Sequence, residues 1–232
     1  TRYGLQADAL PPPFWTTEGP PLQTTRVRLV QQADEVWLFG RLANARKDAL
    51  ALTIVEVLVT LYGDAGADTL DGSYGNDQAS GGDGDDVFVA SSGADTFNGG
   101  AGSGTISLEG YYGVSMSLAT GTATFYGTDS IRFTGVENLR GGWSDDTLTG
   151  STGANVLDGA QGNDSLNGGA GNDTLVGGDG NDTLVGGTGI DTASYEAATV
   201  GVTVNLGLTA AQDTKVGTDK LSGIENVTGS AF

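Results

Sequence analysis

Apolar residues recur every nine positions in two long stretches of this chain, and each lies at the same place in a short motif. Six consecutive nine-residue units cover residues 141–194 without a slip, and a rougher array of five units covers residues 63–107. The shared pattern is Gly-Gly-x-Gly-x-Asp-x-U-x, in which U is apolar. Because side chains alternate between the two faces of a strand, the three residues around U predict a short strand with U facing inward. The predicted core residues are Leu70, Phe88, Phe97, Ile106, Leu148, Leu157, Leu166, Leu175 and Leu184.

The other six residues of each unit predict a turn, so two units make one coil of 18 residues. Strands of successive coils then lie side by side and run in the same direction. The pattern therefore predicts an all-β fold, a parallel β-roll of the β-helix solenoid type. We expect it to be right-handed, because parallel crossover connections nearly always are.

The glycine and aspartate positions add a chemical expectation. Consecutive glycines allow the positive φ angles that a tight turn needs, and a glycine-rich turn also exposes carbonyl oxygens. Calcium takes about six to eight oxygen ligands from carboxylates and carbonyls. We therefore predict that calcium binds in the turns through the side chain at the sixth position of each unit. These residues are Asp68, Asp77, Asp86, Asp95, Asp146, Asn155, Asp164, Asp173, Asp182 and Asp191.

Successive units turn on opposite sides of the roll, so calcium is expected between units n and n+2. The predicted stacks are Asp68 over Asp86, Asp77 over Asp95, Asp146 over Asp164 over Asp182, and Asn155 over Asp173 over Asp191. Coils lie about 4.8 Å apart, and two carboxylates at that spacing repel by about 3 kcal/mol at an effective dielectric of about 20. We therefore expect the metal to act as a folding switch. Gly104, Ser144 and Asn155 depart from the motif, which predicts weaker binding at the ends of the arrays.

The repeat Gly-Gly-x-Gly-x-Asp-x-U-x resembles that of the repeats-in-toxin (RTX) family of secreted calcium-binding proteins, and the resemblance covers residues 63–232. It implies an extracellular protein, secreted or at the cell surface. It also implies export by a bacterial type I system, which commonly reads an uncleaved C-terminal signal.

The rest of the chain divides into four further segments. All five prolines lie in the first 22 residues, which predicts an extended arm, and three runs rich in β-branched residues predict a cap on the open end of the roll. Two spacers share the strings GVSMSL/GVTVNL and GVEN/GIEN, and we expect them to continue the roll as wider coils with a strand at each of the first two strings. The last spacer stops where another unit would start, which fits a truncated array. The predicted segments are an arm (1–22), a β-rich cap (23–62), a first array (63–107), a spacer (108–140), a second array (141–194) and a final spacer (195–232).

Composition excludes several functions. The chain has 29 acidic and 10 basic residues and a net charge of −19, which argues against binding to nucleic acid or to an anionic membrane surface. The most apolar run, residues 50–62, is too short to span a membrane and contains Glu56, so we expect no membrane insertion. Without histidine there is no Ser-His-Asp triad and no His-Glu-x-x-His zinc motif, and we expect no enzyme activity.

Aromatic residues near the first spacer allow two interpretations. They could form a sugar-binding strip, but we favour packing within the coils. The residues are Tyr111, Tyr112, Phe125, Tyr126 and Trp143.

Three functions remain open from the sequence alone. The first, which we favour, is an extracellular structural or adhesive module made rigid by calcium. The second is a secretion and folding appendage of a type I-secreted protease, lipase or epimerase whose catalytic domain lies elsewhere. The third is a surface-layer or virion assembly protein. Other protein chains are candidate partners, through the N-terminal segment or through the open C-terminal coil.

Overall fold

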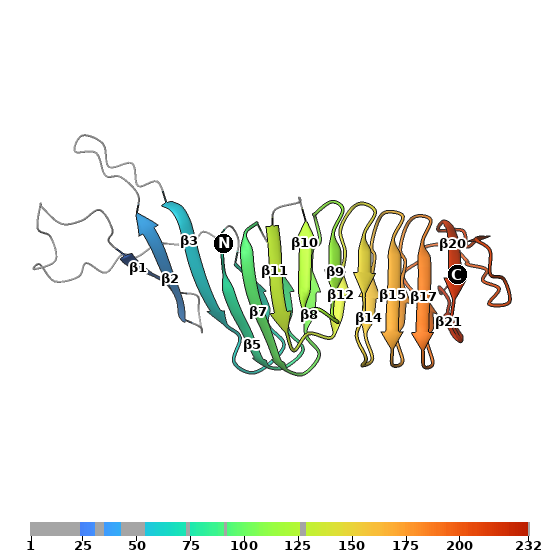
Figure 1. The fold of residues 1–232 in the computed structure, drawn as a ribbon, viewed down its shortest axis with the longest axis horizontal. Helices are drawn as coiled ribbons and strands as arrows, with labels where there is room; N and C mark the ends of the chain where they lie inside the picture. The colour runs from blue at the N-terminus through green and yellow to red at the C-terminus, as the bar shows by residue number, and fades with distance from the viewer. Residues whose placement is uncertain are drawn as a thin grey trace, which may run out of the picture.

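The computed structural model describes residues 24–30, 35–42, 54–72, 75–90, 92–125 and 129–231, with side chains from residue 60 onward except that of residue 129. The predicted arm therefore lies outside the described residues. The described chain forms strands and no helix. These strands make two sheets that face each other along an elongated body (Figure 1).

The larger sheet has thirteen strands and the smaller sheet has eight. In spatial order the larger sheet contains β1 (Thr24–Val30), β2 (Glu35–Leu42), β3 (Ile54–Tyr62), β5 (Gln78–Asp83), β7 (Ala94–Ala101), β11 (Asp129–Thr134), β10 (Thr122–Phe125), β9 (Ser115–Ser117), β13 (Thr147–Thr149), β15 (Ser165–Ala170), β17 (Thr183–Thr188), β20 (Thr218–Ser222) and β19 (Gln212–Asp213). The smaller sheet contains β21 (Asn226–Thr228), β18 (Thr192–Ser194), β16 (Thr174–Val176), β14 (Val156–Asp158), β12 (Asn138–Arg140), β8 (Thr105–Ser107), β6 (Val87–Val89) and β4 (Thr69–Asp71).

Strands of the two arrays alternate between the sheets and pair in parallel with the strand one coil later. Leu148 on β13 is paired with Leu166 on β15, and Leu166 with Leu184 on β17. The smaller sheet has the same register, in which Leu157 on β14 is paired with Leu175 on β16. The fold is therefore the predicted parallel β-roll with coils of 18 residues.

The core is a double row of eighth-position side chains between the sheets. Most are fully buried because each contacts the equivalent residues of the coils before and after it. In the first array the row contains aromatic residues, and the rings of Phe88 and Phe97 stack with centroids 5.1 Å apart. The small residues Ala79 and Ala193 also occupy buried core positions. All nine residues predicted for the core are buried.

The N-terminal strands extend the larger sheet beyond the first array. β1 pairs antiparallel with β2, β2 pairs antiparallel with β3, and β3 then pairs in parallel with β5. The three runs rich in β-branched residues therefore form strands, as the sequence predicts. They continue the sheet that the repeats begin (Figure 1).

The first spacer continues the roll as a wider coil, as we expected, but it also contains antiparallel strands that the sequence did not predict. β11 and β12 do continue the two sheets in parallel with β7 and β8. However, β9 and β10 pair antiparallel with each other, and β10 pairs antiparallel with β11. β9 then starts the second array by pairing in parallel with β13. The larger sheet thus gains two strands that the smaller sheet lacks, which is about 10 Å of extra sheet width on one side of the roll.

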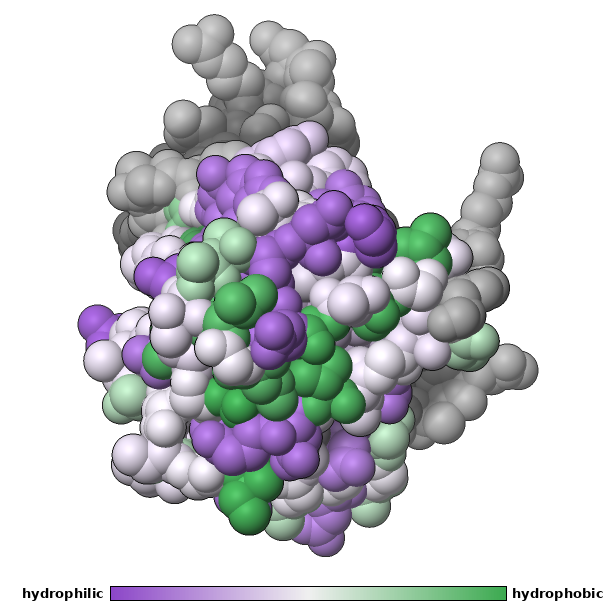
Figure 2. All heavy atoms as spheres, turned by 90° about the vertical axis from the view of Figure 1, so that its right-hand side faces the viewer, coloured by the Kyte–Doolittle hydropathy of each residue, from purple (hydrophilic) through white to green (hydrophobic). Residues whose placement is uncertain are grey.

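The second spacer also continues both sheets, because β20 pairs with β17 and β21 pairs with β18. The strand predicted for GVTVNL is wrong, since residues 201–206 form none. In the first spacer the matching string contains β9, which has a paired strand on each side, and residues 201–206 have neither. Figure 2 shows hydrophobic side chains gathered at this end of the body, where Val200, Leu206 and Leu208 are each more than 40% exposed (43%, 41% and 45%).

A separate observation concerns membranes. Within the described ranges, no helix has the length and apolar character that crossing a bilayer requires.

Candidate metal sites in the turns

The sixth-position carboxylates form ladders along both sides of the roll. In each ladder Oδ1 accepts a hydrogen bond from the backbone N–H of the sixth-position residue one coil earlier. Asp164 accepts from Asp146 at 2.8 Å, and Asp182 accepts from Asp164 at 2.9 Å. The same bond recurs at four other places, where Oδ1 of the later residue accepts from the N–H of the earlier one: Asp86 from Asp68 (3.0 Å), Asp95 from Asp77 (2.9 Å), Asp173 from Asn155 (2.9 Å) and Asp191 from Asp173 (2.9 Å). The structure therefore brings together units n and n+2, as the sequence predicts.

The second oxygen of most of these carboxylates is buried and receives no hydrogen bond. Burying a polar group without a partner costs free energy, and burying a charge costs more, so folded proteins almost always supply a partner. A ladder of such atoms in register fits a cation between the coils. These atoms are the Oδ2 atoms of Asp68, Asp86, Asp164, Asp173, Asp182 and Asp191.

Backbone carbonyl oxygens lie beside these carboxylates, in space that only glycine leaves open. A Cβ at Gly159 would overlap Oδ2 of Asp164 and would lie 2.8 Å from the carbonyl oxygen of Gly177, one coil later. Gly168 has the corresponding arrangement with Asp173. Within the part of the chain that the structure describes, no three acidic side chains form a metal-binding group. A calcium ion here would therefore take most of its ligands from carbonyl oxygens, which are hard ligands that suit it.

Electrostatics also favour a cation. Burial, with smaller contributions from the carboxylates of Asp182 and Asp146, raises the pKa of Asp164 from its ordinary 3.8 to about 8. Burial raises the pKa of Asp182 to about 6, with an added contribution from Asp219. The pKa of Asp173 is raised by burial and by Asp191. Asp164, Asp173 and Asp182 without metal therefore resist ionisation, and a divalent cation between the carboxylates would reverse that effect.

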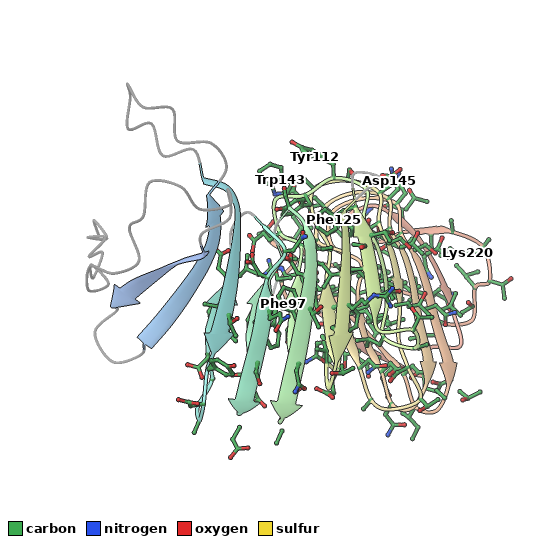
Figure 3. The ribbon with its side chains drawn as sticks, turned by 60° about the vertical axis from the view of Figure 1, so that its left-hand side comes forward. Phe97, Tyr112, Phe125, Trp143, Asp145 and Lys220 are labelled. Atoms are coloured by element: carbon green, nitrogen blue, oxygen red, sulfur yellow. The ribbon has the colours of Figure 1, made fainter. Side chains whose placement is uncertain are left out.

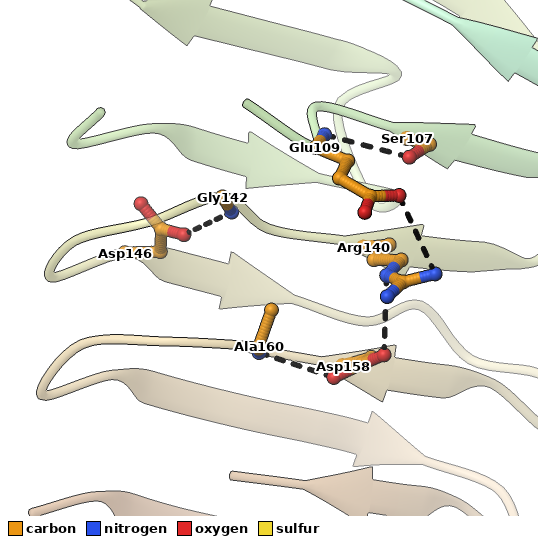
Figure 4. Close-up of polar contacts among 7 residues, drawn as sticks. All are labelled: Ser107, Glu109, Arg140, Gly142, Asp146, Asp158 and Ala160. Atoms are coloured by element: carbon orange, nitrogen blue, oxygen red, sulfur yellow. Dashed lines mark hydrogen bonds and ion pairs between the residues drawn. The ribbon is translucent and has the colours of Figure 1, made fainter. Parts of the chain in front are cut away.

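The first positions of the second array are satisfied by the protein itself. Asp146 Oδ2 accepts from the N–H of Gly142 at 2.7 Å (Figure 4), and its Oδ1 accepts from the N–H of Val114 at 2.8 Å. Asn155 Nδ2 donates to the carbonyl oxygen of Glu137 at 2.8 Å, where an aspartate would present a second oxygen. The remaining two predicted ligands, Asp77 and Asp95, are buried in the first array.

Sequence reasoning missed three acidic residues of the spacers that continue the ladders. Glu137 Oε2 accepts from the N–H of Gly104 at 2.8 Å. Asp219 Oδ1 accepts from the N–H of Asp182 at 3.0 Å, and Glu225 Oε2 accepts from the N–H of Asp191 at 2.9 Å. The available signal was the recurrence of GVEN as GIEN and of GTDSI as GTDKL, which place an acid after a glycine in both spacers.

The aromatic residues near the first spacer do not form one exposed strip. Phe125 is buried, and its ring contacts that of Tyr111 edge to face at 4.9 Å. Tyr112 and Trp143 remain on the surface, with ring centroids 5.5 Å apart (Figure 3). Tyr126 lies outside the described residues. Packing therefore accounts for the inner pair of rings.

Nearby, Arg140 bridges the carboxylates of Glu109 and Asp158 at 3.7 and 3.5 Å (Figure 4). This group lies apart from the ladders, and it links the first spacer to the second array.

Comparison with protein families agrees with the geometry of the turns. The RTX calcium-binding nonapeptide repeat matches the chain in four copies, at residues 59–78, 71–106, 140–175 and 158–193. The matches cover the two arrays and leave both spacers largely outside. A search of curated proteins gave no match.

Proposed function

We propose that the two arrays, which are RTX calcium-binding nonapeptide repeats, make this chain an extracellular module that folds when calcium binds. The folded roll then serves as a rigid structural or adhesive element and catalyses no reaction. The calcium-binding β-roll is the part of this function that the family match and the fold establish. The folding switch, the extracellular role and the lack of catalysis are our proposal.

One observation carries the folding switch. The ladder oxygens that lack a hydrogen-bond donor are buried in register, one coil apart, with carbonyl oxygens beside them. Without metal, folding must bring these carboxylates together and out of water, which the raised pKa of Asp164 and Asp182 reflects. Calcium supplies positive charge between the coils when bound. Folding and metal binding are then one process, because the unfolded chain presents no such set of oxygens.

We assign the ligand role to the carboxylates that keep a buried oxygen available and to the carbonyl oxygens of the turns around them. In the second array these carboxylates belong to Asp164, Asp173, Asp182 and Asp191, and in the first array to Asp68 and Asp86. Asp77 and Asp95 occupy equivalent positions one unit later and are assigned with them. Asp146 and Asn155 lie at the edge of the second array, where the backbone N–H groups of Gly142 and Ser151 already donate to their side-chain oxygens.

The extracellular and non-catalytic parts rest on composition and family. RTX repeat proteins are typically secreted by bacteria, and an environment rich in calcium would keep the roll folded. The sequence contains neither histidine nor cysteine, so the commonest general base and the thiol nucleophile are both missing. Its sixth-position carboxylates lie in the turns of the roll, where they fit metal binding.

Far-UV circular dichroism of the chain in chelator and in calcium tests this function. We expect little strand signal in chelator and a cooperative gain on addition of calcium. Magnesium should substitute poorly, because its small and strict octahedral shell suits a carbonyl-rich turn less well. A full strand spectrum in excess chelator would contradict the folding switch.

A further inference from the structure

The last coil of the roll repeats the hydrogen bonds of the arrays, although its sequence lies outside the repeat match. Thr218 N–H donates to Asn181 Oδ1 at 2.8 Å, just as Asn181 N–H donates to Asn163 Oδ1 at 2.9 Å one coil earlier. Lys220 N–H donates to the carbonyl oxygen of Asp182 at 2.7 Å, just as Thr183 N–H donates to the carbonyl oxygen of Asp164 one coil earlier. Gly217-Thr218-Asp219 therefore occupies the fourth to sixth positions of a turn.

The turn on the opposite side of the same coil is shorter, and it also places an acid where a repeat has its sixth-position aspartate. A Cβ at Gly186 would overlap the carbonyl oxygen of Gly223, so Gly223 takes the place of the first glycine of a repeat. Glu225 N–H donates to the carbonyl oxygen of Asp191 at 3.0 Å. The acid follows its glycine after one residue instead of four. The longer side chain of glutamate makes up for the shorter turn, because Oε2 still reaches the N–H of Asp191 at 2.9 Å.

Asp219 and Glu225 each lie one coil beyond an aspartate whose Oδ2 receives no hydrogen bond. Asp182 is 1% exposed and Asp191 is 0% exposed, and Oδ2 of both is buried without a hydrogen bond. Across the gap, Asp219 and Glu225 make the same carboxylate-to-N–H bond that an array aspartate makes. We propose that Asp219 and Glu225 are calcium ligands that close the last metal position on each side of the roll. This inference rests on the proposed function, since it extends the same ladders by one coil.

The surroundings of Asp219 show how the ladder ends. Its Oδ2, the oxygen that an array aspartate leaves without a donor, accepts from the hydroxyls of Tyr195 at 3.0 Å and Thr214 at 2.8 Å. Protein donors therefore replace a further ion at this position. Glu137, the matching acid of the first spacer, faces Gly104, which has no carboxylate to share a metal. The assignment is thus specific to Asp219 and Glu225.

The experiment counts calcium ions bound to the full chain by native mass spectrometry and by isothermal titration. Glu225→Gln and Asp219→Asn should each bind one ion fewer than the wild type, and the double variant two fewer. Glu225→Asp keeps the charge but shortens the side chain, so it should also lose one ion. Asp213→Asn, an exposed acid of the same spacer paired with Lys215 at 3.0 Å, should keep the wild-type count.

Two results would overturn the assignment. One is a wild-type count in both Glu225→Gln and Asp219→Asn, and the other is an equal loss in Asp213→Asn, which would indicate a general charge effect. If Asp219→Asn does not reach the wild-type spectrum in calcium, the two Glu225 variants decide, because that side chain is exposed and a change there leaves the core intact. A wild-type chain that binds no calcium would refute the proposed function itself, and so the two failures are distinguishable.

Discussion

Replacing Asp164 with asparagine should change the stability of the roll in opposite directions with and without calcium. Burial raises the pKa of this carboxyl from 3.8 to about 8 in the metal-free roll. At about pH 7.5 the unfolded carboxyl is ionised and the folded one is largely protonated. Protonating a carboxyl about 3.7 pH units above its ordinary pKa of 3.8 costs roughly 5 kcal/mol, and folding without metal bears this cost. Asparagine avoids this cost, and Asn155 shows that an amide fits a ladder, because its Nδ2 donates to the carbonyl oxygen of Glu137.

In chelator, Asp164→Asn should therefore fold more readily than the wild type, by about 2–4 kcal/mol once the burial of the amide is allowed for. In calcium the variant loses the charged ligand of the metal position that Asp164 shares with Asp182. A site at 100 times its dissociation constant contributes about 2.7 kcal/mol, so the loss should be about 2–3 kcal/mol.

Two titrations followed by far-UV circular dichroism measure these effects. In chelator, folding is driven by trimethylamine N-oxide, which favours compact states, and the midpoint should move to a lower concentration for the variant. In calcium, unfolding by urea should move to a lower concentration. Asp179→Asn, which removes an exposed charge from the neighbouring turn, should change either midpoint much less. Destabilisation of Asp164→Asn in chelator as well as in calcium would refute the argument from buried charge.

Three further outcomes can be measured on the same chain. The pKa values of Asp164 and Asp182 are raised to about 8 and about 6, so the folded metal-free chain binds more protons than the unfolded chain. In chelator, the stability of the fold should therefore rise as the pH falls from about 8 to 4. A strand signal that grows with pH would contradict this. Gly178→Ala should destabilise the calcium-bound roll by more than about 1 kcal/mol, because φ is 99° and a Cβ would overlap a carbonyl oxygen of the adjacent coil. The control Gly229→Ala should leave the thermal midpoint unchanged, because a Cβ there would meet nothing within 4 Å. Leu166→Ala should lower the free energy of unfolding in calcium by about 2–5 kcal/mol in urea titrations, because Leu166 is fully buried, and a loss below about 1 kcal/mol would show that the core row relaxes around the gap.

The periodic part of the structure could be predicted because one interaction repeats at one spacing. Leu166 contacts its equivalents only if coils contain 18 residues, and the same spacing brings Asp164 over Asp146. Glycine, aspartate and leucine each fix one property of the unit, namely the turn, the ligand and the core. Their agreement over eleven units left little freedom in the fold or in the array ladders.

The spacers escaped prediction because their loops break that spacing. Asp219 follows Asp182 by 37 residues and Glu225 follows Asp191 by 34, although each lies one coil away in space. Alternation of apolar residues also could not identify strand partners. GVSMSL and GVTVNL alternate alike, yet only the first contains a strand, because a strand needs a paired edge that residues 201–206 do not have.

The strand pairing described above also determines how the roll responds to force. Backbone hydrogen bonds between coils run along the length of the body. A pull on its two ends would therefore break these bonds one coil after another. Such an arrangement resists tension weakly, since each coil can peel away separately. Ions between the coils would join adjacent coils along the direction of the force and so resist their separation. The mechanical strength of the roll would then follow the calcium concentration around it.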